Sequence, residues 1–198
     1  MLGVSVPFRS HPFYLIVFFT VYLISPIWSE TIYVPQDFST IQSAIENCQN
    51  RDQIIVSPGY YRENLRLNGV DIVLRSTNPN DPEIVKQTVV DGGALAAVIT
   101  LAGNETSACQ IVGLTLTNGQ QSVGAGIFGN NSTATIALNQ IVNNRAFSKG
   151  DGQAHGGGIA RCNGQILGNH ILNNLVESTS ASGSGGGIYQ SNGMIANN

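Results

Sequence analysis

The strongest acid–base candidates in this chain are two polar residues in a glycine-rich stretch. Asp151 and His155 lie four positions apart in AFSKGDGQAHG, which covers Ala146–Gly156. A carboxylate and an imidazole held close together could transfer protons as a general acid or base. A solvated loop often carries the same residue types by chance. We therefore interpret Asp151 and His155 as unrelated polar residues of a solvated loop, and the alternative is that they are catalytic residues.

The remaining polar residues match no catalytic or metal-binding motif. The sequence contains no HExxH, CxxC or GxSxG pattern. The GDG around Asp151 is similar to calcium-binding glycine/aspartate repeats, but those occur in tandem and this one does not. We interpret Arg62 and Glu63 as residues that satisfy turn groups, and His170 as a surface or ladder position. No metal ligand and no cofactor-binding residue is expected.

Three asparagines begin N-glycosylation sequons: Asn104 in NET, Asn130 in NNS and Asn131 in NST. An Asn-x-Ser/Thr sequon is an acceptor of N-linked glycan in an exported protein. These sites matter only where the source glycosylates the proteins that it exports.

The first 29 residues predict a signal peptide. Arg9 and His11 precede an apolar run from Phe13 to Ile24, and the small residue Ser29 offers a cleavage point. An uncleaved membrane anchor is the alternative, but the run is shorter than the roughly 20 apolar residues that a spanning helix needs. Pro26 also interrupts it. In either case, we expect a secreted or cell-surface protein.

Composition excludes one class of partner and says little about disulfides. Of the 198 residues, 11% are charged, against about 25% in typical soluble domains. There are 9 Lys and Arg and 12 Asp and Glu, with no basic run, so nucleic acid is not an expected partner. Cys48, Cys109 and Cys162 lie in unrelated contexts and are interpreted as small buried hydrophobes. One disulfide with one thiol left over is the alternative.

An internal repeat is the main signal for the fold. The pattern I-x-x-N-x-I-x-x-N occurs twice, thirty positions apart, and a third copy begins near the end of the chain. The first copy is Ile136, Asn139, Ile141 and Asn144, the second is Ile166, Asn169, Ile171 and Asn174, and the third begins with Ile195 and Asn198. A period between about 20 and 50 residues is typical of a solenoid, in which each repeat buries its apolar face on the next.

The second segment of each repeat decides which solenoid is expected. A leucine-rich repeat also carries L-x-x-L-x-L-x-x-N, but it needs a helical or 3₁₀ segment in every repeat. Here that segment reads Gly-Gly-Gly-Ile, which has poor helix propensity. The sequence therefore predicts two strands per repeat and a parallel β-helix. Stacked asparagines should form two ladders, one of Asn139, Asn169 and Asn198 and one of Asn118, Asn143 and Asn173.

One amphipathic helix is expected, over Ser39–Cys48, with Ser39 and Gln42 as a capping box. Ile41 and Ile45 should face the core, so that the helix covers the open end of the first coil. From there on, the chain reads as strands and turns without another helix. Two Gly/Ser-rich loops, Ala146–Gly156 and Glu177–Gly185, interrupt the repeat at the same place and should map to one face.

Residues 30–198 resemble secreted proteins of the pectin-lyase-like superfamily. The resemblance lies in TIYVPQDFSTIQSAIENCQNRDQIIVSPGYYRENL, in VDIVLRSTNPNDPEIVKQTVVDGG and in the Gly-Gly-Gly-Ile and Asn-x-Ile-x-x-Asn repeats. It implies an all-β, right-handed parallel β-helix with a short N-terminal capping helix. The superfamily includes polysaccharide lyases, hydrolases and esterases, and also repeat proteins of no known activity. The active-site motifs of pectin methylesterases and polygalacturonases have no counterpart here.

We therefore expect an exported, adhesin-like module that binds polysaccharide or cell-surface glycans, with no complete catalytic centre in these residues. The alternative is a carbohydrate-active enzyme acting on uronate-rich polysaccharide, for which a lyase would use Ca²⁺. The chain stops at Asn198, within a third copy of the repeat. This indicates the N-terminal part of a longer protein, with further coils, or another chain, as the partner of its open end.

Overall fold

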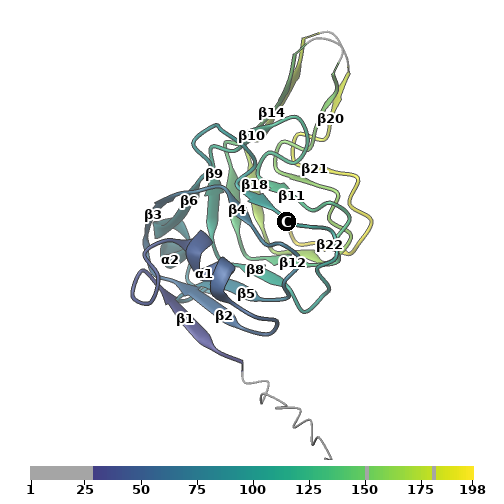
Figure 1. Cartoon of the computed structure of the whole chain (residues 1–198). Helices are drawn as coiled ribbons and strands as arrows, with labels where there is room; N and C mark the ends of the chain where they lie inside the picture. The colour runs from purple at the N-terminus through teal and green to yellow at the C-terminus, as the bar shows by residue number, and fades with distance from the viewer. Residues whose placement is uncertain (1–28, 150–151, 180–181) are drawn as a thin grey trace, which may run out of the picture.

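Parallel strands stack in register along the chain in a computed structural model that describes residues 29–149, 152–179 and 182–198 (Figure 1). Sheet A is the longest, and successive coils contribute its seven strands in chain order: β1 (Thr31–Val34), β2 (Gln53–Val56), β5 (Val73–Ser76), β8 (Gln110–Val112), β12 (Thr135–Ala137), β17 (Ile166–Leu167) and β22 (Ile195–Ala196).

Two five-stranded sheets complete the walls of the solenoid. Sheet B follows sheet A in each coil and contains β3 (Gly59–Arg62), β6 (Thr88–Asp91), β9 (Thr115–Thr117), β13 (Gln140–Val142) and β18 (His170–Leu172). Sheet C returns the chain to sheet A and contains β4 (Leu65–Arg66), β7 (Ile99–Thr100), β11 (Ile127–Phe128), β16 (Ile159–Ala160) and β21 (Ile188–Tyr189). The predicted parallel β-helix is therefore confirmed.

The prediction of two strands per repeat is wrong, because each full coil has three walls. The I-x-x-N-x-I-x-x-N frame spans two strands rather than one, with Ile136 in β12 and Ile141 in β13 and a bend at Leu138–Asn139 between them. The third strand, in sheet C, is two residues long in every coil. The Gly-Gly-Gly-Ile segment therefore leads into a short strand, as predicted, and the strand that the sequence missed is the second one within the I-x-x-N-x-I-x-x-N frame.

The core consists of apolar columns that run along the solenoid. In sheet A, register places five buried side chains one above another: Ile54, Leu74, Ile111, Ile136 and Ile166. Each such side chain contributes roughly 1.5–3 kcal/mol when fully buried. The repeated isoleucines of the sequence are thus the inward positions of stacked strands.

One of the two predicted asparagine ladders is confirmed, and the other lies one residue further along. Asn169 Oδ1 accepts from Asn139 Nδ2 at 3.1 Å, and Asn198 Oδ1 accepts from Asn169 Nδ2 at 2.8 Å. The second ladder joins Asn144 to Asn174, whose Oδ1 accepts from Asn144 Nδ2 at 3.0 Å. The predicted members are instead bend residues with φ between 54° and 58°: Asn118, Asn143 and Asn173. Asparagine tolerates this left-handed conformation better than most residues.

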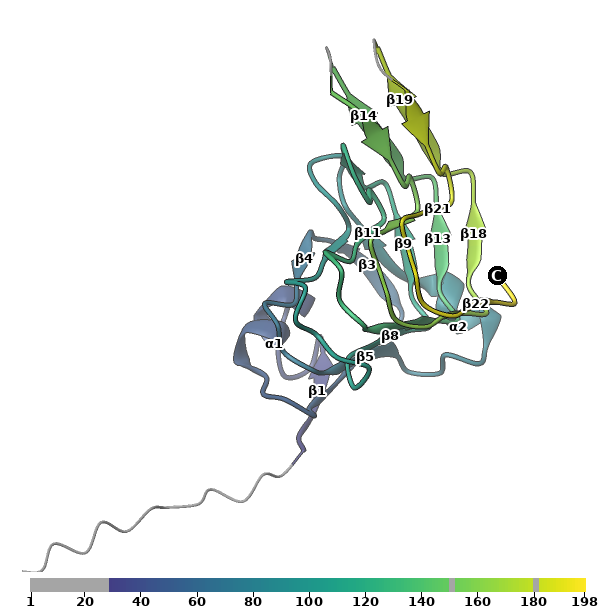
Figure 2. The ribbon, with the colours of Figure 1, turned by 90° about the vertical axis from the view of Figure 1, so that its right-hand side faces the viewer.

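The first helix, α1 (Ile41–Asn47), covers the N-terminal end of the solenoid (Figure 2). Ile41 and Ile45 are buried in the main core, as predicted. The N-cap is Thr40 rather than Ser39, because the Thr40 side chain accepts from the Ser43 amide. Gln42 does not form a capping box. Its side chain bonds the backbone N–H and C=O of Arg66, so that it satisfies the outer edge of sheet C.

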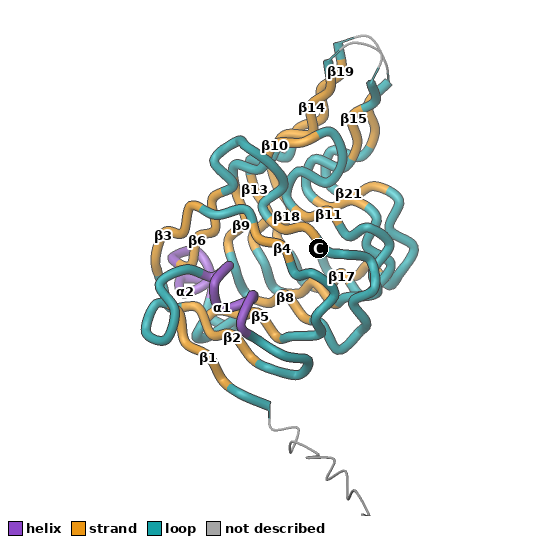
Figure 3. Tube along the Cα trace, in the orientation of Figure 1, coloured by secondary structure: helices purple, strands orange, loops and turns teal. Residues whose placement is uncertain are grey.

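A second helix, α2 (Pro82–Gln87), contradicts the expectation that no helix follows the first (Figure 3). Its N-cap is Asp81, whose side chain accepts from the Glu83 amide, and proline stands in the first turn. Both are ordinary helix-start signals. The surrounding run of Asn, Pro and Asp was interpreted as a polar loop, so these two helix-start signals were overlooked.

The two inserted segments lie on one face, as predicted, but they contain paired strands rather than loops alone. Sheet D joins β10 (Gln120–Gln121), β14 (Arg145–Ser148) and β19 (Leu175–Ser178), and sheet E joins β15 (Ala154–His155) and β20 (Gly183–Ser184). Figure 2 shows β14 and β19 extending beyond the walls of the solenoid. The strands of the two insertions pair in parallel, because each insertion stacks on the equivalent insertion of the neighbouring coil.

The predicted signal peptide, residues 1–29, lies outside the described residues except for Ser29. Within the described part of the chain, no helix is long and apolar enough to span a membrane. All three cysteines are free thiols; Cys109 and Cys162 are buried and Cys48 is half-buried.

Candidate functional site

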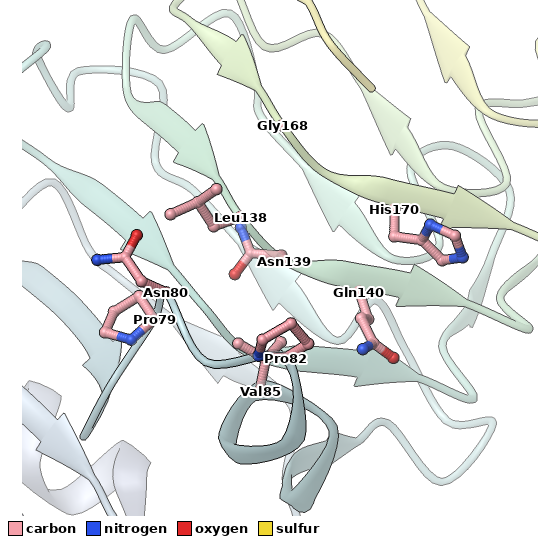
Figure 4. Close-up of a pocket in the computed structure, with 9 residues that line it drawn as sticks. All are labelled: Pro79, Asn80, Pro82, Val85, Leu138, Asn139, Gln140, Gly168 and His170. Atoms are coloured by element: carbon pink, nitrogen blue, oxygen red, sulfur yellow. The ribbon is translucent and has the colours of Figure 1, made fainter.

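A pocket of about 440 Å³ lies beside α2, at the corner where sheet A turns into sheet B (Figure 4). The loop before α2 and the helix itself form one wall. The bends and first residues of β13 and β18 form the other. The lining residues are Pro79, Asn80, Pro82, Val85, Leu138, Asn139, Gln140, Gly168 and His170. The volume falls within the roughly 300–1,000 Å³ of ordinary ligand sites.

The position of α2 follows from one outward column of sheet B. Register places Thr115, Gln140 and His170 side by side on the outer face of β9, β13 and β18. The Thr115 hydroxyl donates to the Val85 carbonyl at 2.8 Å, which holds α2 over the first of these strands. The next two members of the column, Gln140 and His170, are left uncovered and form part of the pocket.

The adjoining bends shape the opposite side. Gly113, Leu138 and Gly168 occupy the same bend in three successive coils, each with φ between 57° and 67°. Pro79 packs so closely on Gly113 that a Cβ there would lie 2.5 Å from the proline. Leu138 is 39% exposed and Gly168 carries no side chain, so the pocket opens where the loop no longer covers the bend.

The pocket is polar but uncharged. Asn80, Gln140 and His170 offer hydrogen-bond donors and acceptors, and none of their side chains bonds another described residue. Pro79, Val85 and other apolar groups surround them. Among the described lining residues there is no Asp, Glu, Lys or Arg. Such a site suits a neutral ligand with many hydroxyl groups better than an ion.

The sequence-predicted catalytic pair does not belong to this pocket. Asp151 lies outside the described residues. His155 is buried in β15, with its ring stacked on Tyr189 at a centroid distance of 4.2 Å. Its Nε2 lies 3.0 Å from Gln153 Oε1. His155 therefore packs the base of the projecting strands against sheet C.

His170 lies at the surface, as predicted, whereas Glu63 bonds the start of a helix rather than a turn. The Glu63 carboxylate accepts from the backbone N–H groups of Ile41 and Gln42, at 3.0 and 2.8 Å, and thereby holds the N-terminus of α1. His170 is exposed on the surface of sheet B. Within the part of the chain that the structure describes, no group of three or more His, Cys, Asp or Glu side chains is placed to hold a metal ion.

The strands of sheet B carry one carboxylate, that of Asp91, and it accepts three hydrogen bonds. Asp91 is buried and accepts from the Tyr60 hydroxyl, from Asn118 Nδ2 at 2.9 Å and from the Gly93 amide at 2.6 Å. Burial raises the pKa of this carboxyl, but the three hydrogen bonds and the charge of Arg62 outweigh it and hold the pKa below its ordinary value. Asp91 therefore stays ionised and acts as a structural acceptor.

The cysteines offer no nucleophile. Burial raises the pKa of the Cys48 thiol to about 11 and that of the Cys109 thiol to about 12, and it raises the pKa of Cys162 as well. The reactive form of cysteine is the thiolate, so these thiols are inert at neutral pH.

Sequence reasoning missed the pocket, because its residues belong to distant segments. Leu138 and Gln140 appeared only as spacers between repeat positions, and Asn80 only as part of a loop. Asp81-Pro82 was the signal that could have revealed α2. No known protein family, curated protein or solved structure matches this chain. The parallel solenoid is therefore established by the structure alone.

Proposed function

We propose that this chain is an exported module of the pectin-lyase-like superfamily that binds neutral glycan, on a polysaccharide or a cell surface, in the pocket beside α2. The observation that carries the proposal is the combination of free amide and imidazole groups with an apolar, uncharged surround. The superfamily assignment is supported by the capping helix, by the stacked coils and by the two resembling segments, Thr31–Leu65 and Val70–Gly93.

Sugar hydroxyls and sugar C–H faces match the two kinds of surface in the pocket. Asn80 and Gln140 each present both an amide donor and a carbonyl acceptor, which is the pairing that a hydroxyl group needs. Leu138 and the prolines can cover the apolar face of a pyranose ring. A uronate would bring a carboxylate into a site whose described lining contains no Lys or Arg, and would lose hydration there with little compensation.

The expected affinity of a single sugar unit is low. A neutral hydrogen bond contributes about 0.5–1.5 kcal/mol net, so three polar side chains supply a few kcal/mol at most. A free energy of about −4 kcal/mol corresponds to a dissociation constant near 1 mM. Useful retention would then come from repeated units on one polymer or from many copies of the protein on one surface.

Affinity electrophoresis through gels that contain soluble neutral polysaccharides tests this proposal, with polygalacturonate as the acidic comparison. The parent should be retarded by at least one neutral polymer, and the double variant Gln140→Ala/His170→Ala should lose most of that retardation. Gln165→Ala, an exposed glutamine at the start of the sheet A strand in the same coil, is the matched control and should behave as the parent. Equal retardation of the double variant, or retardation by polygalacturonate alone, would contradict the proposal.

A further inference from the structure

The three sequons lie at one corner of the solenoid, where sheet C passes into sheet A. Asn104 follows β7, and Asn130 and Asn131 follow β11 one coil later. The two coils touch here, because Asn130 Nδ2 donates to the Ala102 carbonyl at 2.6 Å. The sequons are therefore neighbours in space, and their surroundings distinguish them.

The three acceptor asparagines differ in exposure and in hydrogen bonding. Asn104 and Asn131 are exposed, and among the described residues none hydrogen-bonds either side-chain amide. The third residue of each sequon, Thr106 and Thr133, is exposed as well. An oligosaccharide on the Asn131 amide would extend into solvent without moving a neighbouring coil. The Asn104 amide is exposed and has no hydrogen-bond partner among the described residues, but one side of it lies against Gly69 of the preceding coil, where a Cβ would come within 2.5 Å of Nδ2.

Asn130 is held differently. Its Nδ2 is already bonded across the coils, to the Ala102 carbonyl. The hydroxyl residue of its sequon, Ser132, is 1% exposed, and its Oγ is enclosed. A glycan attached to Asn130 would have to occupy the contact between two coils.

We propose that Asn104 and Asn131 are N-glycosylated during export, and that Asn130 is not. The donor is a lipid-pyrophosphate-linked oligosaccharide. The amide nitrogen forms a bond to the anomeric carbon while the bond from that carbon to the pyrophosphate oxygen breaks. The pyrophosphate leaves with the electron pair, and the nitrogen loses one proton to a base of the transferring enzyme. This inference rests on the proposed export and is independent of the proposed glycan binding.

The two modified asparagines leave the pocket uncovered. They lie at the corner before sheet A, and the pocket lies at the corner after it, so the full width of sheet A separates them. Glycan would shield the corner between sheets C and A from proteases and from other chains, while the face of sheet B stays accessible.

Expression through a glycosylating secretory pathway, followed by glycosidase-induced mobility shift and mass spectrometry of the secreted protein, tests the inference. The parent should carry two glycans. Thr133→Ala destroys only the Asn131 sequon and should remove one glycan, whereas Ser132→Ala destroys only the Asn130 sequon and should remove none. Asn104→Gln should remove the other glycan.

Each outcome of this comparison decides the inference. Secreted protein that carries glycan on Asn130, or that lacks glycan on either Asn104 or Asn131, overturns it. If residues 1–29 do not direct secretion in the host, a version with the host's own leader supplies the secreted protein, and the same three variants are compared. Since electrophoretic retardation by neutral polysaccharide is measured separately on unglycosylated protein, failure here is distinguishable from failure of the proposed binding.

Discussion

The early and the late coils satisfy the backbone groups at their corners in different ways. In the first coils, single carboxylates accept from backbone N–H groups. Glu105 alone accepts from Gly69, Ala102 and Gly103, at 3.0, 2.7 and 2.9 Å, and Asp52 accepts from Glu30 and Gln49. In the later coils, the ladder asparagines take this role, and Asn144 Oδ1 accepts from the Gly119 amide at 2.8 Å.

The hydrogen-bonding chemistry of carboxylates and asparagine amides explains why the early coils use one and the late coils use the other. An ionised carboxylate is only an acceptor, so it can collect several N–H groups at an irregular corner. Carboxylates stacked about 4.8 Å apart in successive coils would repel one another. An asparagine both accepts and donates, so each member of a ladder satisfies the next. In regular coils, one asparagine position repeated in every coil therefore satisfies the corner backbone groups. In irregular coils, each corner needs its own carboxylate.

Ile45→Asp should have the largest effect, because it places a charge in the apolar end of the solenoid beneath α1. An unpaired buried charge costs more than the total stability of most domains, so we expect the early coils not to fold. Asn47→Asp adds the same charge on the exposed side of α1 and is the control. Far-ultraviolet circular dichroism and the melting temperature measure both variants. A parent-like melt for Ile45→Asp would show that α1 does not cap the core.

The same contrast explains what the sequence could predict. The late coils were predictable because stacking requires the same inward isoleucine and the same ladder asparagine every thirty positions. The position of the second ladder was wrong by one residue, because Asn143 and Asn144 are adjacent and spacing alone cannot tell a bend residue from a bonded one. The pocket was not predictable, since it depends on how the loop before α2 packs on the bend of the next coil and leaves the two later bends uncovered.

Asn169→Ala should cost several kcal/mol of unfolding free energy. The change leaves the Asn139 N–H and the Ile136 carbonyl without their partners, and each unsatisfied buried group costs about 1–3 kcal/mol. Gln165→Ala, an exposed change in the same coil, should be neutral. The midpoint of urea unfolding measures both. Equal midpoints would show that the ladder does not stabilise the late coils.

Glu105→Gln should cost less, about 2 kcal/mol, because one acceptor oxygen remains. The new NH₂ group replaces an oxygen that accepts from a backbone amide, so a hydrogen bond to a charged group is lost. Glu46→Gln, on the exposed side of α1, makes the same chemical change without a buried contact. If the two variants unfold at the same urea concentration, the carboxylate at this early corner is replaceable and the contrast with the ladders fails.

Asp91 should give the early coils a pH dependence that the ladders lack. The folded-state pKa of Asp91 is lowered, so its contribution to stability is complete above the unfolded pKa of about 3.9 and is lost as the pH falls through the folded value. The difference in unfolding free energy between the parent and Asp91→Asn should therefore shrink as the pH falls from 6 towards 3. Asn144→Ala should show a difference that does not vary over this range. A constant difference for Asp91→Asn would contradict the pKa assignment.

Leu138→Gly should have the smallest effect on the free energy of unfolding, and unlike the other variants it should stabilise the protein. Leu138 has a φ of 57°, in a bend where the coils on both sides use glycine, and an L-residue in this conformation costs about 1–2 kcal/mol. Glycine loses about 0.5–1 kcal/mol more in backbone entropy on folding. The net result should be stabilisation by about 1 kcal/mol or less.

If the leucine is nevertheless present because it lines the pocket, the same variant should melt at a slightly higher temperature and bind neutral polysaccharide less well. A variant that is more stable and binds as the parent does would remove Leu138 from the site, whereas a variant that is less stable would show that its contacts outweigh the strain of its backbone.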